Sequence, residues 1–76
     1  MNLVINGESQ SALVTTLSAL VEHLGMKADR VAIELNREII PRDQWSQTAL
    51  HEGDRLEIVQ FVGGGSTASI IQEGRI

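Results

Sequence analysis

Hydrophobic and polar positions change their spacing along the chain, and the spacing indicates which segments form strands. Met1–Asn6 alternates loosely and leads into Asn6-Gly7, a dipeptide that tolerates the positive φ angles of a tight hairpin turn. A returning strand is predicted over Gln10–Thr15. Farther along, Val31–Asn36 alternates with its apolar side chains on one face, and Leu56–Val62 is a strongly apolar run. Four strand segments are therefore expected.

One segment has the spacing of a helix instead. Its aliphatic residues recur at i, i+3, i+4 and i+7, which places them on one helix face: Leu17, Leu20, Val21 and Leu24. Thr16 is a suitable N-cap, and Gly25 is a suitable terminator. The pattern predicts one short amphipathic helix after the second strand.

The order of these elements indicates the fold class. After the third strand, Ile39-Ile40 continues the apolar signal until Pro41 breaks it, and Trp45 follows in a loop-rich stretch, where we expect it to cover the edge of the core. A single amphipathic helix needs a sheet face to cover. We therefore predict an α+β protein of the ubiquitin-like β-grasp type, with a mixed sheet of four to five strands and one main helix packed on one face.

Composition narrows the possible chemistry. A chain of 76 residues forms a single core, and with one Phe, one Trp and no Tyr that core must be aliphatic. The absence of cysteine removes disulfides, thiolate nucleophiles and Cys-ligated metals. His23 and His51 are 28 positions apart with no third ligand at metal spacing, so we predict two solvated histidines and no metal site.

Charge and hydropathy narrow the possible partners. The formal net charge is −4 and the six cations are scattered, which argues against nucleic acid and favours a basic patch on a protein partner. No apolar run approaches the roughly 20 residues that span a bilayer, and the N-terminus has no signal-peptide pattern. We expect a cytoplasmic protein that is monomeric by itself, with no membrane partner.

The last strand opens directly into three glycines, which read Gly63-Gly64-Gly65. Glycine has no side chain and few backbone restrictions, so such a segment can enter a narrow active-site channel of a partner. A flexible linker is the alternative. If the strand alternates, Val59 and Phe61 lie opposite the core face. We expect them to form an exposed docking patch that continues into Val62 and Gly63.

Five short motifs occur in a fixed order: Asn6-Gly7, Thr16-Leu17, Val31–Asn36 followed by Ile39-Ile40-Pro41-Arg42, Gly53-Asp54 followed by Leu56–Val59, and Phe61–Gly65. In this order and at these spacings, the chain resembles the ThiS-type ubiquitin-like sulfur carriers of thiamin biosynthesis. The resemblance covers nearly all of residues 1–65, although each motif is weak when taken alone.

The resemblance implies a chemistry for the last glycine. In this family an E1-like adenylyltransferase uses ATP to activate the terminal carboxylate, here that of Gly65, with Gly64 as the required neighbour. A cysteine desulfurase relay then supplies sulfur to form a thiocarboxylate, and thiazole synthase takes the sulfur for the thiazole ring. The domain would be a substrate of these partners rather than an enzyme, and it would bind no cofactor itself.

The eleven residues 66–76 depart from the family's pattern. They have too little apolar mass to fold alone, so we expect a 1–65 domain followed by a disordered tail. The tail could be a pro-segment that is cleaved, a linker to a downstream domain, or residues added by cloning. While it is attached, the carboxylate of Gly65 is tied up in a peptide bond and cannot be adenylated.

Other functions fit the same features. The chain could carry sulfur for molybdopterin or cysteine synthesis, or it could be a ubiquitin-like modifier that joins its last glycine to a lysine. It could also be a regulatory β-grasp module fused to an enzyme. A modifier would leave covalent adducts on other proteins, whereas a carrier would leave a free thiocarboxylate.

Overall fold

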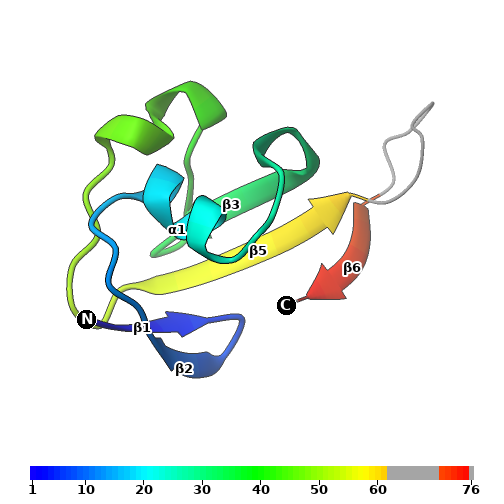
Figure 1. Cartoon of the computed structure of the whole chain (residues 1–76). Helices are drawn as coiled ribbons and strands as arrows, with labels where there is room; N and C mark the ends of the chain where they lie inside the picture. Colours follow the sequence, from blue (N-terminus) through cyan, green and yellow to red (C-terminus); the bar gives the residue numbers. More distant parts are fainter. Residues whose placement is uncertain (62–70, 76) are drawn as a thin grey trace.

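The computed structural model describes residues 1–61 and the backbone of residues 71–75. In chain order the elements are β1 (Asn2–Ile5), β2 (Glu8–Ser11), α1 (Leu17–His23), the 3-10 turn η1 (Ala28–Arg30), β3 (Val31–Leu35), β4 (Glu38–Ile39), the 3-10 helix η2 (Arg42–Gln47), β5 (Arg55–Phe61) and β6 (Ile71–Arg75). They form a twisted sheet with α1 across one face (Figure 1).

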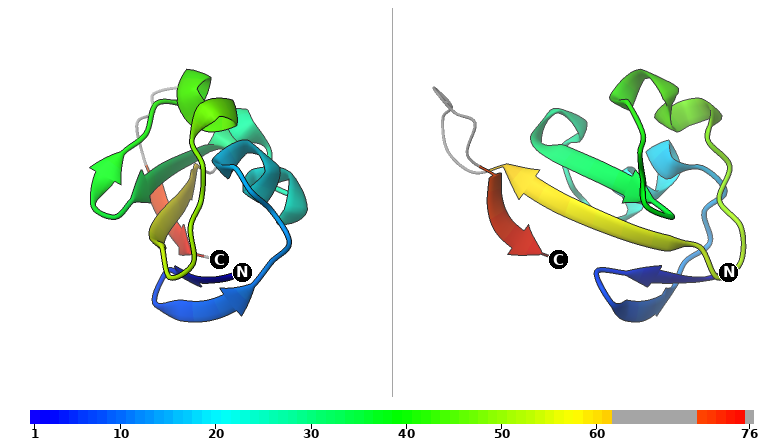
Figure 2. Two further views of the ribbon diagram at one scale, coloured as in Figure 1. Left: turned by 90° about the vertical axis from the view of Figure 1, so that its left-hand side faces the viewer. Right: turned by 180° about the vertical axis from the view of Figure 1, so that it is seen from behind.

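The sheet has the strand order β2-β1-β5-β3-β4, and β6 pairs with β5 outside this path. β1 runs parallel to β5, while the pairs β1/β2, β3/β4 and β3/β5 are antiparallel. Figure 2 shows that α1 lies on a single side of the sheet. The predicted α+β fold of the ubiquitin-like β-grasp type, with a mixed sheet and one main helix, is confirmed.

The core lies between α1 and the covered face of the sheet. Its buried residues are aliphatic apart from one tryptophan: Leu3, Ile5, Ala12, Val14, Leu17, Leu20, Val21, Val31, Ile33, Trp45, Leu50, Leu56 and Ile58. Ile33 of β3 and Ile58 of β5 are directly opposite each other in the ladder. Among the residues 1–61, whose side chains are described, the last member of the core is Ile58.

Helix α1 begins and ends where its sequence predicts. The backbone N–H of Ala19 donates to the side-chain oxygen of Thr16 at 3.1 Å, which satisfies one of the free amides of the first turn. At the other end Gly25 has a φ of +74°, its N–H donates to the Glu22 carbonyl, and the N–H of Met26 donates to the Val21 carbonyl. This pair of hydrogen bonds is the Schellman arrangement that a left-handed glycine permits.

The first hairpin confirms the predicted turn but shifts the second strand. Asn6 and Gly7 have φ angles of 52° and 85°, as a two-residue type I′ turn requires. Such a turn leaves no room for a longer connection, so β2 begins at Glu8 and ends at Ser11. The predicted strand over Gln10–Thr15 was therefore placed too late. Beyond Ser11 the chain leaves the sheet, and Leu13 is 97% exposed.

A second hairpin and a short 3-10 helix close the other edge. Asn36 and Arg37 have φ angles of 50° and 74° and join β3 to β4. Trp45 lies in η2 rather than in an irregular loop, is 3% exposed, and donates its indole N–H to the Ile40 carbonyl at 2.9 Å. Its predicted position over the edge of the core is confirmed.

The tail differs from the expectation of disorder over residues 66–76. The backbone of Ile71–Arg75 forms strand β6, which pairs antiparallel with the C-terminal end of β5. Pairing with an existing edge needs no apolar core, since an edge strand presents free N–H and C=O groups to any extended segment. Residues 62–70 and 76 lie outside the described part of the chain, as does the predicted boundary at Gly65.

Candidate functional site

The last three residues of β5 present one face of the sheet to solvent. Leu56 and Ile58 are 2% and 0% exposed beneath α1, whereas Phe61 is 37% exposed and Val59 is half-buried. Successive strand residues point to opposite faces, so Val59 and Phe61 lie on the face that α1 leaves open. The predicted alternation is confirmed, while a docking role for this pair remains a prediction.

The predicted reactive glycines come directly after this face in the sequence. Gly63, Gly64 and Gly65, together with Val62, lie outside the described residues. The structure therefore defines the base from which they extend, namely the end of β5 at Phe61. β5 is the central strand, and β3 pairs with it as far as Gln60, one residue before this base.

The edge of β5 that faces β1 is extended by a side chain. β1 pairs with β5 only as far as Leu56, where the backbone N–H of Asn6 donates to the Leu56 carbonyl at 2.9 Å. The Asn6 side chain then takes both backbone groups of Ile58: its Nδ2 donates to the carbonyl at 3.1 Å, and its Oδ1 accepts from the N–H at 2.8 Å. Asn6 thus continues the ladder where β1 has turned away.

Sequence reasoning identified Asn6 only as a turn residue and missed this second role. A glycine at the same position would supply the positive φ angle equally well, so the turn alone does not require asparagine. The partner of Asn6 lies 52 positions away in the chain. No local pattern could have indicated it.

The open face carries a shallow depression at the other end of β5. It has a volume of about 450 Å³ and is lined by residues of both charges together with apolar and polar groups: Val4, Gly7, Glu34, Asn36, Arg37, Arg55, Leu56 and Glu57. Arg55 lies six residues before Phe61, which corresponds to roughly 20 Å along a strand. At its nearer end the lining reaches Glu57, two residues before Val59 on the same face, so the depression borders the pair Val59 and Phe61.

Asp54 has a structural role in the turn before β5. Its carboxylate accepts hydrogen bonds from the backbone N–H of His51 at 2.8 Å and from the Asn36 side chain at 3.1 Å. The Asn36 side chain accepts in turn from the Arg55 N–H at 3.0 Å. These contacts join the two turns at this end of the sheet and fix where β5 begins.

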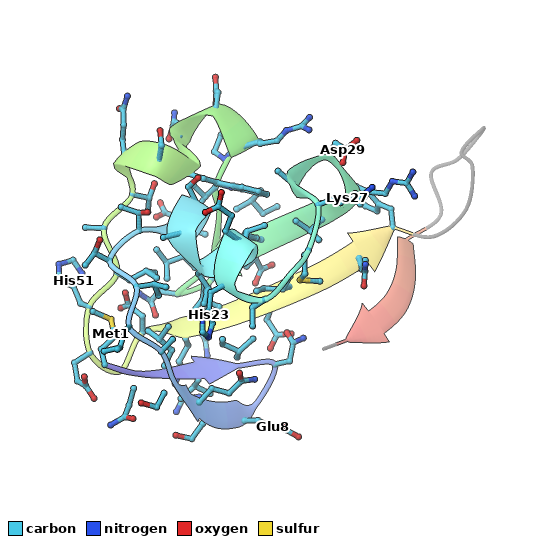
Figure 3. All side chains as sticks on the ribbon, viewed as in Figure 1. Met1, Glu8, His23, Lys27, Asp29 and His51 are labelled. Carbon is cyan, nitrogen blue, oxygen red and sulfur yellow. The ribbon has the colours of Figure 1, made fainter. Side chains whose placement is uncertain are left out.

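The two histidines come from different elements, as Figure 3 shows, and both are exposed. His23 ends α1, while His51 precedes β5 and lies 3.9 Å from the Asp54 carboxylate. Among residues 1–61 and 71–75, no group of three or more His, Cys, Asp or Glu side chains is arranged to hold a metal ion. Their solvation is confirmed, and the absence of a bound metal stays a prediction.

Within the described residues, no helix is long and apolar enough to cross a membrane.

Known proteins match the chain over most of its length. The chain is 48% identical over 67 residues to a thiazole synthase from Paramagnetospirillum magneticum, covering 87% of this chain and 21% of that protein. It is 32% identical over 66 residues to the sulfur carrier protein ThiS of Escherichia coli, covering 86% of this chain and 100% of the carrier. The chain thus spans about a fifth of the thiazole synthases that it matches.

A solved structure gives the same result for the fold. The crystal structure of a thiamine biosynthesis protein (ThiS) from Geobacter metallireducens superposes with a TM-score of 0.73 at 32% identity, covering 86% of this chain and 100% of that one. The sequence model of the ThiS family matches residues 3–65, from the first core residue of β1 to the last of the three glycines. The chain belongs to the ThiS family.

Proposed function

We propose that this chain is a sulfur carrier of thiamin biosynthesis, and that the carboxyl group of Gly65 carries the sulfur. The observation that carries the proposal is the family match, which ends at Gly65. The matched thiazole synthases support the thiazole branch over molybdopterin or cysteine synthesis. The domain acts as a substrate for partner enzymes and catalyses no reaction itself.

The chemistry begins with release of the carboxylate. Hydrolysis of the Gly65–Ser66 peptide bond frees it, and one carboxylate oxygen then attacks the α-phosphorus of ATP on an E1-like adenylyltransferase, with pyrophosphate leaving. The outer sulfur of a persulfide, delivered by a cysteine desulfurase relay, attacks the carbonyl carbon, and AMP leaves with the transferred oxygen. A thiol then attacks the inner sulfur of the resulting acyl disulfide, which is reduced as the thiol becomes part of a disulfide. The product is a thiocarboxylate, from which thiazole synthase takes the sulfur.

The contribution of the domain is to position this end. A carboxylate is a poor electrophile, and its reaction depends on holding the chain end in line with the activating groups of a partner. Any Cβ at Gly64 would widen the chain and restrict its backbone angles on entry into a narrow active site. The neighbouring patch of Val59 and Phe61 supplies apolar contact area for docking.

Intact-mass analysis of the protein recovered from its own cells tests the proposal. The expected species ends at Gly65 and carries one sulfur in place of one oxygen. Finding only chains that retain residues 66–76, or only the oxygen form during thiamin-limited growth, would contradict the proposal.

Substitution at Gly64 tests its positional requirement. Gly64→Val is expected to leave the fold unchanged, because the core residues described within 1–61 end at Ile58, and to abolish thiocarboxylate formation. The matched control is Ser9→Val, which adds the same side chain on the exposed part of β2 and is expected to load sulfur normally. Normal loading of Gly64→Val would remove the requirement for glycine at this position.

A second candidate function is suggested by the two thiazole synthases in which the matching region makes up about a fifth of the protein. In such an arrangement the carrier domain would be a module of a longer chain that also holds the synthase. The gene sequence downstream of the codon for Ile76 distinguishes the two. A catalytic domain in the same reading frame supports the module, and a stop codon contradicts it.

A further inference from the structure

The edge of β5 that faces β1 is covered by different groups in turn. The backbone of β1 covers it at Asp54 and Leu56, through hydrogen bonds of 2.9 Å from the N–H groups of Val4 and Asn6. The side chain of Asn6 covers it at Ile58. Backbone groups of alternate residues point to the same edge of a strand, so Gln60 is the next residue that faces it.

Strand β6 covers this last position. Gln60 pairs with Gly74, and its neighbours Val59 and Phe61 pair with Arg75 and Ile71. β3 occupies the opposite edge as far as Gln60, so β6 lies on the same edge as β1. Figures 1 and 2 show β6 beside the C-terminal end of β5, beyond the tip of the β1/β2 hairpin.

We propose that Ile71–Arg75 is an intramolecular strap. It adds to β5 as a strand, occupies the edge position at Gln60, and holds both ends of residues 62–70 at neighbouring strands. An edge with unpaired backbone groups accepts an extended segment in this way, with hydrogen bonds supplying affinity and little demand on side-chain identity. The occupant of the site is this chain itself.

The pairing is suited to release. It spans three residue pairs, and the register shifts between Gln60 and Phe61, so the β6 residues between Ile71 and Gly74 have no regular partner. Short pairing with such an irregularity stabilises a strand weakly. The strap can therefore open without breaking the pairing of β5 with β1 or β3, and the core residues described within 1–61 end at Ile58.

The consequence for the glycines rests on the proposed function. With β6 in place, the two residues that flank 62–70 in the chain, Phe61 and Ile71, are paired with each other. Detachment of β6 precedes access to the segment by a processing enzyme. The strap thereby controls when the Gly65–Ser66 peptide bond can be hydrolysed and the carboxylate of Gly65 released.

Hydrogen exchange in the full chain tests the pairing. Gly74→Pro removes the N–H that faces Gln60, and the exchange rate of the Gln60 amide is expected to rise at least about tenfold. The Ile58 amide is an internal reference, because it donates to Asn6 rather than to β6. The control is Arg75→Pro, whose N–H faces away from β5 by the same alternation, and it is expected to leave both rates unchanged.

Proteolysis tests the restraint. Cleavage within residues 62–70 by a non-specific protease is expected to be faster in Gly74→Pro by a similar factor, and unchanged in Arg75→Pro. An unprotected Gln60 amide in the unsubstituted chain, or equal exchange in both variants, would overturn the strap. Equal cleavage rates in Gly74→Pro and Arg75→Pro would show that the strap does not restrict protease access to residues 62–70. Neither measurement involves sulfur, so failure of the carrier chemistry would leave both results interpretable.

Discussion

The two halves of β5 differ in how they are held, although they belong to one strand. From Arg55 to Ile58, both edges are hydrogen-bonded to β3 and to β1 or Asn6, and one face is sealed under α1. From Val59 to Phe61, one edge depends on β6, and the open face bears the half-buried Val59 and the partly exposed Phe61. The first half contributes stability, and the second half forms the base of the glycine segment. Substitutions in the first half should therefore lower the free energy of unfolding. Substitutions in the second half should weaken partner binding with little effect on stability.

The largest effect is expected for Ile58→Ala in the first half. Ile58 is fully buried, so the truncation leaves a cavity and should lower the free energy of unfolding by roughly 2–5 kcal/mol. Ile58→Val should cost about 1 kcal/mol and keep the protein folded. Urea unfolding measures both. The control is Ile39→Ala, since Ile39 is 74% exposed, and a loss at position 39 equal to that at 58 would contradict the difference.

A smaller loss of stability is expected at Asn6. Asn6→Ala removes both hydrogen bonds to the Ile58 backbone. It also places alanine, which has no polar side chain to stabilise a positive φ angle, at a φ of 52°. The two effects together should lower the free energy of unfolding by about 1–3 kcal/mol. Asn6→Gly tolerates the φ angle and isolates the hydrogen bonds. If Asn6→Gly unfolds in urea at the same midpoint as the unsubstituted chain, the two side-chain hydrogen bonds of Asn6 contribute nothing to stability.

The smallest effect on stability, with a clear effect on binding, is expected for Phe61→Ala. The side chain is partly exposed and lies outside the core, so the free energy of unfolding should change by less than about 1 kcal/mol. Binding to thiazole synthase should weaken by at least roughly tenfold, as measured by calorimetry. Leu13→Ala is the control, because Leu13 is 97% exposed in another part of the chain. Unchanged affinity in Phe61→Ala would remove the docking role of this face.

Local features were predicted well from the sequence. The Asn6-Gly7 turn, the Thr16 cap, the Gly25 terminator and the alternation in β5 depend on residues within a few positions of each other. Each is determined by backbone sterics or by side-chain periodicity, which short segments retain in any fold. The same local reasoning placed β2 too late, because the start of that strand depends on the exact length of the turn before it.

The β3/β4 hairpin shows where local reasoning is insufficient. Its turn places Arg37 at a φ of 74°, a conformation for which arginine has no intrinsic preference. The Asn36 side chain contacts Asp54 and Arg55 at the start of β5, which anchors the turn from outside its own sequence. The strain at Arg37 is therefore balanced by contacts of its neighbour with residues 18 and 19 positions away.

The sequence by itself determined the main helix, three of the strands, the aliphatic core and the family pattern that ends in three glycines, because those depend on spacing and residue type. Only the tertiary structure decided which edge of β5 is covered by β1, by Asn6 and by β6. An edge is defined by its neighbours in space, and here those neighbours come from both ends of the chain. Backbone groups carry no sequence signature, so their partners become visible only once the strands are placed.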